Sequence, residues 1–231
     1  MRKLSALLIV AVLMTFGHKG FSQIIETDWH ITTPRPYSPK TTLVQKIGIS
    51  KVKLTYSRPR VTDQRFGRNN DRTGKIWGGI VPYATEKRAN VWRAGANENT
   101  VISFSDKVKI EGKELAAGTY GLHMQLFKDG KATIIFSKNH TSWGSFSYNK
   151  NEDALRVDVQ TKKAPFKRES LSYDFMNFTA NSADLVLHWE NKQIPFKITF
   201  DVHQLVVANF KKELRSSAGY KWRGWYGAAK G

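Results

Sequence analysis

Apolar and polar residues alternate in short runs between Leu43 and Val202, which is the pattern of a chain built from β-strands. In residues 51–57 (KVKLTYS) every second residue is apolar, as in a strand that buries one face. Residues 155–160 (LRVDVQ) and 171–175 (LSYDF) show the same period of two. Such runs recur about every ten residues and are separated by turn residues. The sequence therefore predicts an all-β fold, a sandwich of two antiparallel sheets, over residues 43–202.

Three turns are expected to connect neighbouring strands. Glu111-Gly112-Lys113 and Lys128-Asp129-Gly130-Lys131 each place a glycine where a hairpin requires unusual backbone angles. A third turn is expected at Asn191-Lys192, where it would pair residues 184–190 with residues 193–202.

Two long segments before and within the strands lack this pattern. Residues 23–42 contain three prolines among Thr and Ser, which predicts an extended lead-in without regular structure. Residues 57–100 are rich in Arg, Asn and Gly and have little periodicity. We expect them to form a long, partly structured insertion that crosses one end of the sandwich.

The last residues, 203–231, are predicted to form a helical extension. Apolar residues recur at helical spacing over residues 204–214, and Lys211, Lys212 and Arg215 stand near the end of this segment, where cations suit the helix dipole. Gly219 is expected to end the helix, and a second helix is expected within residues 220–229. The extension either docks on the sandwich or frays.

The first 22 residues have the layout of a secretory signal peptide. A positive segment at residues 1–3 precedes an apolar run at residues 4–16, which is shorter than the roughly 20 residues needed to span a bilayer. Small residues at Gly20 and Ser22 favour cleavage before Gln23. A membrane anchor or a buried helix is the alternative interpretation. We expect an exported protein, periplasmic or extracellular, with no membrane span.

The chain is strongly basic, with 37 Lys and Arg against 19 Asp and Glu, a net charge of +18. Cleavage after Ser22 would remove three cations and no acid, which leaves 34 against 19, or +15. Such a field attracts polyanions, which in the envelope are lipid headgroups, lipopolysaccharide phosphates and acidic glycans; nucleic acid is not expected there. The densest basic stretch, residues 60–75, holds five cations and two acids and is predicted to be a flexible loop. The alternative is a basic surface that only keeps the protein soluble.

The densest group of chemically capable residues is the segment 91–99 (VWRAGANEN). Trp92 can stack on a ring, Arg93 can bind a carboxylate or phosphate, and Asn97 and Glu98 can bind hydroxyls. We expect Arg93 and Glu98, with Arg58 and Asn97, to form one hydrogen-bonded cluster at an end of the sandwich. Alternatively, Arg93 and Glu98 only pair internally and Trp92 belongs to the core.

The segment 143–148 (WGSFSY) is a second candidate. If it forms a strand, Phe146 and Tyr148 lie on one face, and with Trp143 they would make a platform for a sugar ring. If the same side chains are buried, they belong to the core.

Catalytic and metal motifs are missing from the sequence. The chain has no cysteine, which excludes disulfides, thiolate metal sites and a cysteine nucleophile. The histidines lack metal-binding spacing, and His188 with Glu190 is predicted to be a polar pair at the surface. No cofactor, metal or catalytic residue is expected. Paired carboxylates for glycoside hydrolysis remain open, with members drawn from this set: Glu98, Glu152, Asp153 and Glu190.

Several motifs, in a fixed order, carry a resemblance to a family of exported bacterial proteins, domain of unknown function 2911. They are Tyr56-Ser57-Arg58-Pro59, Val81-Pro82-Tyr83, residues 91–98, residues 117–122, Trp143-Gly144 with Tyr148, Trp189-Glu190 and residues 194–197. The resemblance covers residues 32–200, with two departures: residues 60–76 are longer than usual, and His123 stands in a strand that is usually more apolar. It implies a β-rich exported protein, and the family has no established activity.

The candidate ligand-binding residues are Arg58, Tyr83, Trp92, Arg93, Asn97, Glu98, Trp143 and Tyr148. Two functions are compatible with them. The first is a noncatalytic binding or structural module for a glycan or another envelope partner. The second is a carboxylate-dependent hydrolase of extracytoplasmic glycans. The sequence does not determine the ligand or the oligomeric state.

Overall fold

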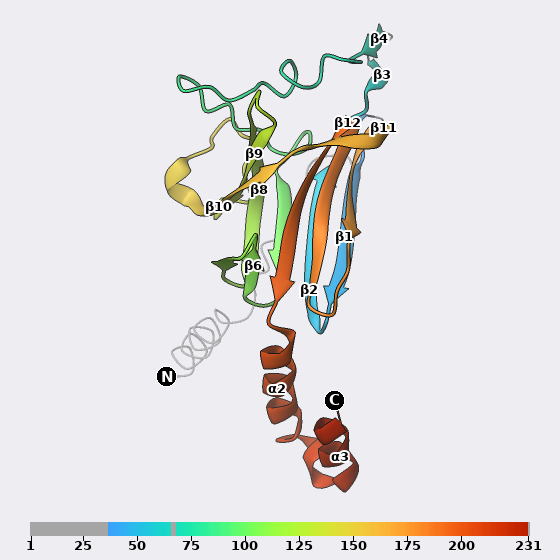
Figure 1. Cartoon of the computed structure of the whole chain (residues 1–231), viewed down its shortest axis with the longest axis vertical. Coiled ribbons are helices and arrows are strands. Elements are labelled where there is room, and N and C mark those ends of the chain that lie inside the picture. Colours follow the sequence, from blue (N-terminus) through green and yellow to red (C-terminus); the bar gives the residue numbers. More distant parts are fainter. Residues whose placement is uncertain (1–36, 66–67, 231) are drawn as a thin grey trace, which may run out of the picture. The chain divides into compact units, whose positions relative to one another are not determined.

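A computed structural model describes residues 37–65 and 68–230 of the chain (Figure 1). The predicted signal peptide, and the predicted lead-in as far as residue 36, lie outside the described residues. Within the described ranges, no helix is long and apolar enough to cross a membrane.

The described chain is mostly β, and the paired strands of both larger sheets are antiparallel, which confirms the predicted fold class. The larger sheet has the order β1 (Lys40–Ile47), β2 (Ser50–Ser57), β5 (Thr100–Phe104), β8 (Gly118–Leu126), β9 (Lys131–Ser137) and β10 (Asp153–Gln160). The smaller sheet has the order β11 (Lys162–Met176), β12 (Ser182–Phe200), β6 (Val108–Ile110) and β7 (Lys113–Leu115). Strand β1 begins three residues before the predicted start of the sandwich.

The core lies between the two larger sheets. Leu54 and Ile102 of the larger sheet and Leu187 and Phe200 of the smaller one belong to one buried apolar cluster. In β2 the apolar residues are buried and the intervening lysines exposed, as the period of two predicts. The alternation in β2 therefore predicts correctly which of its faces meets the opposite sheet.

The two glycine-containing turns are confirmed, and the third predicted turn is wrong. Hairpins β6–β7 and β8–β9 form where predicted. Asn191-Lys192 does not reverse the chain, because β12 continues as one strand from Ser182 to Phe200. This strand pairs with β11 along most of its length and with β6 at its last three residues, so only an unbroken strand reaches both partners. Glu190, with φ of 52°, lies at an irregularity in the register with β11.

The predicted insertion, residues 57–100, contains more order than expected. Its basic part forms a two-stranded hairpin, β3 (Thr62–Arg65) and β4 (Arg68–Asp71), rather than a simple loop (Figure 1). Its second part adds isolated bridges to β8, in which Tyr83 pairs with Leu126 and Trp92 with Met124. The insertion thus continues the larger sheet beside β8, where β5 has ended.

The C-terminal helices are confirmed. Helix α2 (Val202–Glu213) follows β12 directly, and the Asp201 side chain caps it by accepting from the Gln204 backbone N–H at 3.1 Å. A 3-10 turn, η2 (Ser217–Tyr220), leads to α3 (Trp222–Lys230). Val202 and Leu205 pack against the core. Aromatic side chains of the last segment remain exposed, namely Tyr220, Trp222, Trp225 and Tyr226.

Leu54→Ala should lower the free energy of unfolding by about 2–5 kcal/mol, because it leaves a cavity in a fully buried position of a central strand. Chemical denaturation measures the change. The control is Val44→Ala in the neighbouring strand β1, where the side chain is 58% exposed and the change should stay within about 0.5 kcal/mol. Equal losses for the two variants would contradict the assignment of the core.

Candidate functional site

A cleft of about 370 Å³ opens where β2 ends, β5 begins and β9 ends. Its described lining comes from seven separate places in the chain: Ser38, Pro59, Arg72, Ile80, the segment Trp92, Arg93, Gly95, Ala96 and Asn97, then Trp143 and Trp189. We term it the Trp–Arg cleft. Its volume is in the range of sites that hold small molecules.

Three indole rings pack together beside this cleft. The rings of Trp92 and Trp189 stack with centroids 6.2 Å apart, and Trp77 stands edge-on to both, at 6.1 and 5.9 Å. The bridge between Trp92 and Met124 sets this position, because directly opposed residues of antiparallel strands point to the same side. Met124 belongs to the core, so Trp92 faces inward toward Trp189.

Arg93, the next residue, is half-buried and pairs with no described carboxylate. Its Nη1 donates to the Asn97 carbonyl, and its guanidinium lies 5.4 Å from the centre of the Phe146 ring. Burial lowers the pKa of Arg93. The guanidinium is therefore partly desolvated, and no described residue neutralises its charge.

Two other cations lie near Arg93, and only one of them is paired with a described carboxylate. Arg72 also lines the cleft, but its Nη2 donates to Asp63 at 2.9 Å, so its charge is compensated. The Lys192 ammonium lies 5.6 Å from the centre of the Trp77 ring, and burial lowers its pKa. Among the described residues, no carboxylate pairs with Lys192.

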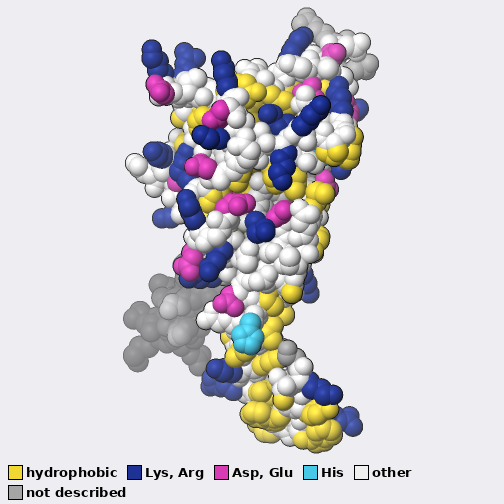
Figure 2. Space-filling model, in the orientation of Figure 1, with side chains coloured by type: hydrophobic (Ala, Val, Ile, Leu, Met, Phe, Trp, Pro, Cys, Tyr) yellow, Lys and Arg dark blue, Asp and Glu magenta, His cyan; other side chains and the backbone are white. Residues whose placement is uncertain are grey.

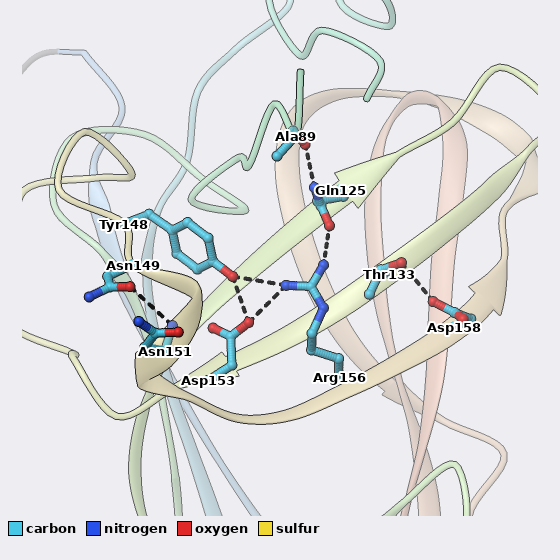
Figure 3. A network of polar contacts seen from close by, with 9 residues as sticks. All are labelled: Ala89, Gln125, Thr133, Tyr148, Asn149, Asn151, Asp153, Arg156 and Asp158. Carbon is cyan, nitrogen blue, oxygen red and sulfur yellow. Dashed lines mark hydrogen bonds and ion pairs between the residues drawn. The ribbon is translucent and has the colours of Figure 1, made fainter. Parts of the chain in front are cut away.

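Beside the cleft, the outer face of β8 carries a buried polar network (Figure 3). The Tyr148 hydroxyl donates to Asp153 Oδ2 at 2.6 Å, and Arg156 Nη1 donates to both of these oxygens at 2.8 Å. Arg156 Nη2 also donates to Gln125, whose amide donates to the Ala89 carbonyl. Burial and Asp153 raise the pKa of Tyr148. A short 3-10 turn, η1 (Lys150–Glu152), connects Tyr148 to Asp153.

His123 lies on the same face of β8 and is almost fully buried. Its Nδ1 is 2.9 Å from the Ser145 hydroxyl, and its ring centre is 5.4 Å from that of Tyr148. Burial lowers the pKa of His123 to about 4, with Asp153 opposing the shift and Arg93 adding to it. His123 is therefore neutral at pH 7. The loop from Asn139 to Asn149 holds Ser145 and Tyr148 against this face.

Of the eight predicted site residues, four line the Trp–Arg cleft: Trp92, Arg93, Asn97 and Trp143. The other four have structural partners elsewhere. Arg58 Nε donates to the Leu171 carbonyl, the Tyr83 ring lies against Gly78, and Glu98 pairs with Lys40 at 3.5 Å and accepts from Ser57. The predicted single cluster is thus divided: Arg93 contacts Asn97, and among the described contacts neither Glu98 nor Arg58 joins them.

Two further expectations are corrected. Residues 143–148 form a loop and not a strand; Trp143 is 54% and Phe146 83% exposed, whereas Tyr148 is half-buried in the polar network. His188 and Glu190 are not a surface pair, because both are buried. His188 Nε2 contacts the Phe166 carbonyl at 3.1 Å, and Glu190 accepts from the Gly74 N–H at 2.7 Å. The segments that bury these two side chains are β11, over His188, and the insertion, over Glu190. Both segments are distant from residues 188–190 in the sequence.

Sequence reasoning missed the contribution of Trp77 and Trp189 to the site. Trp189 stands within the motif Trp189-Glu190, which was the available signal. Trp77 lies in a segment without periodicity, and no feature of the sequence indicated that it belongs to the site. No group of three or more His, Asp or Glu side chains in the described parts of the chain is placed to hold a metal ion.

Gly144→Ala tests how the 139–149 loop positions Arg93. Gly144 has φ of 67°, and a Cβ there would lie 2.5 Å from the Arg93 guanidinium. The left-handed backbone should cost about 1–2 kcal/mol of unfolding free energy, and displacing Arg93 from the Asn97 carbonyl about 1 kcal/mol more. Gly112→Ala, with φ of 80° and open space around the new Cβ, should show only the backbone cost. Equal losses of unfolding free energy in Gly144→Ala and Gly112→Ala would contradict the conclusion that Gly144 positions Arg93.

Stability should fall with acid because of His123. The pKa of His123 in the folded protein is about 4, below the ordinary value of 6.5. The contribution of neutral His123 to the free energy of unfolding is therefore fully present above pH 6.5 and is lost as the pH falls toward 4. The full loss is about 3 kcal/mol. Denaturation at a series of pH values should show the free energy of unfolding falling from pH 7 to pH 4, and His123→Gln should make this slope shallower; buried His188, whose pKa is also lowered, accounts for part of the slope that remains. His203→Gln, at an exposed position on α2, should keep the slope; a wild-type slope in His123→Gln would refute the assignment.

Comparison with known proteins gives a family. A family model described as "Protein of unknown function (DUF2911)" matches residues 38–198. This match spans the two sheets and includes every residue that lines the Trp–Arg cleft. Searches of the curated proteins and of the solved structures found no match. The chain belongs to the DUF2911 family of proteins of unknown function.

Proposed function

We propose that this protein is exported to the cell envelope and acts there as a noncatalytic binding module that holds a saccharide in the Trp–Arg cleft. The observation that carries the proposal is the lining of the cleft, in which indole rings stand beside hydrogen-bonding groups. The basis for export is the signal-peptide layout of residues 1–22.

The lining suits a sugar ring for two reasons. The exposed Trp143 offers a flat apolar face that packs against the C–H groups of a ring, and the Trp92 ring, stacked on Trp189, lines the cleft beside it. Polar groups beside them, the Arg93 guanidinium and the Asn97 amide, can bind hydroxyls.

The hydrolase alternative is not supported by the composition of the cleft. Glycoside hydrolysis requires two carboxyl groups on either side of the scissile bond. None of the described residues that line the cleft is Asp or Glu. Glu98 pairs with Lys40, Asp153 with Arg156, and Glu190 with a backbone N–H, so each acts in the structure rather than in an open site.

Trp143→Ala should weaken saccharide binding at least tenfold, or about 1.4 kcal/mol, because it removes an exposed aromatic wall of the cleft. A glycan array of neutral and acidic oligosaccharides selects the ligand, and calorimetry measures the dissociation constant. The matched control is Trp225→Ala on α3, an exposed tryptophan outside the cleft, which should bind as the wild type does. Absence of any saccharide binding, or equal weakening by both variants, would refute the proposed function.

A further inference from the structure

We propose that the saccharide held in the Trp–Arg cleft is acidic, and that its carboxylate or phosphate group binds Arg93. This inference rests on the proposed function and adds the chemical class of the ligand. It depends on how charge is distributed around the cleft.

Among the described residues, no carboxylate compensates the charge of Arg93. The guanidinium is half-buried and contacts a backbone carbonyl and an aromatic ring, neither of which carries a full negative charge. Removing a charge from water without supplying an opposite charge costs free energy. An oxyanion that accepts two hydrogen bonds from the guanidinium offsets this cost. Arg72, in the same cleft, already has such a partner in Asp63.

The surroundings favour an anion as well. Lys192, whose ammonium lies over the Trp77 ring, is a second partly desolvated cation that pairs with no described carboxylate. The described lining contributes no acid that would repel an anionic ligand. Elsewhere on the surface, Lys and Arg are interspersed with Asp and Glu, as Figure 2 shows for one face. The cleft therefore differs from that face in having, at Arg93, a cation that pairs with no described carboxylate.

The position of Arg93 gives the ligand a defined orientation. Arg93 and the exposed Trp143 line the same cleft, so one molecule can place a ring against Trp143 and an anionic group at Arg93. Gly144 allows the guanidinium to lie against the 139–149 loop, and Asn97 holds its Nη1. A guanidinium held in this way binds a planar carboxylate or a phosphate with a fixed geometry.

Calorimetry with paired probes tests the inference. Trigalacturonic acid is compared with its uncharged methyl ester, and glucuronic acid with glucose 6-phosphate, on the purified protein and on Arg93→Gln and Arg93→Lys. The matched control is Arg88→Gln, which removes one exposed cation outside the cleft. Thermal unfolding checks that each variant is folded. If Arg93→Gln does not fold, Arg93→Lys still tests the inference, because lysine keeps the positive charge but lacks the paired N–H donors of the guanidinium.

We expect the wild type to bind the acid at least tenfold more tightly than the ester. Arg93→Gln should abolish this preference, Arg93→Lys should reduce it, and Arg88→Gln should keep it. Preference for glucose 6-phosphate over glucuronic acid would support a phosphate-bearing ligand at the same residue, and the reverse preference a uronic acid.

Two results would overturn the inference and leave the proposed function intact. In the first, acid and ester bind equally well to the wild type. In the second, Arg93→Gln and Arg88→Gln weaken acid binding equally and 1 M salt abolishes the preference, since exposed charges are screened over about 3 Å at that salt concentration. If neither probe binds, and no saccharide on the glycan array binds, the proposed function itself fails.

Discussion

The burial of both faces of β8 is the constraint on which the site depends. Leu122, Met124 and Leu126 point into the core, and the alternating residues His123 and Gln125 are equally buried on the opposite side. A sandwich strand usually leaves that second face to water. Here it is covered by irregular segments, namely residues 83–92 of the insertion and the 139–149 loop.

Covering a polar face requires partners for its buried polar groups, and the network around Arg156 supplies most of them; Asp153 Oδ1 has no partner among the described residues. Gln125, Tyr148 and Asp153 are each bound directly to the Arg156 guanidinium (Figure 3). His123 is accommodated differently, as a neutral ring beside the Ser145 hydroxyl. These contacts fix the covering loop, and the loop in turn places Gly144 and Phe146 against Arg93.

The same covering segment gives the cleft its two kinds of lining. Trp92 forms a backbone β-bridge with Met124, and its ring turns inward to Trp189, whereas Arg93 contacts the 139–149 loop. An aromatic wall and an uncompensated cation thus follow from two consecutive residues on opposite sides of one extended segment. The family match includes both residues.

The sequence by itself determined the local features of this protein. The period of two placed the inward residues of β2, two glycine turns were located correctly, and the C-terminal helices were recognised, because each depends on a short stretch of chain. Only the tertiary structure decided which segments meet. It made β12 continuous through Asn191-Lys192, buried His188 and Glu190, separated Glu98 from Arg93, and gathered three tryptophans from distant positions. The physical reason is that alternation reports one buried face of a strand, whereas the second face of β8 and the Trp–Arg cleft are made by segments that carry no periodic signal.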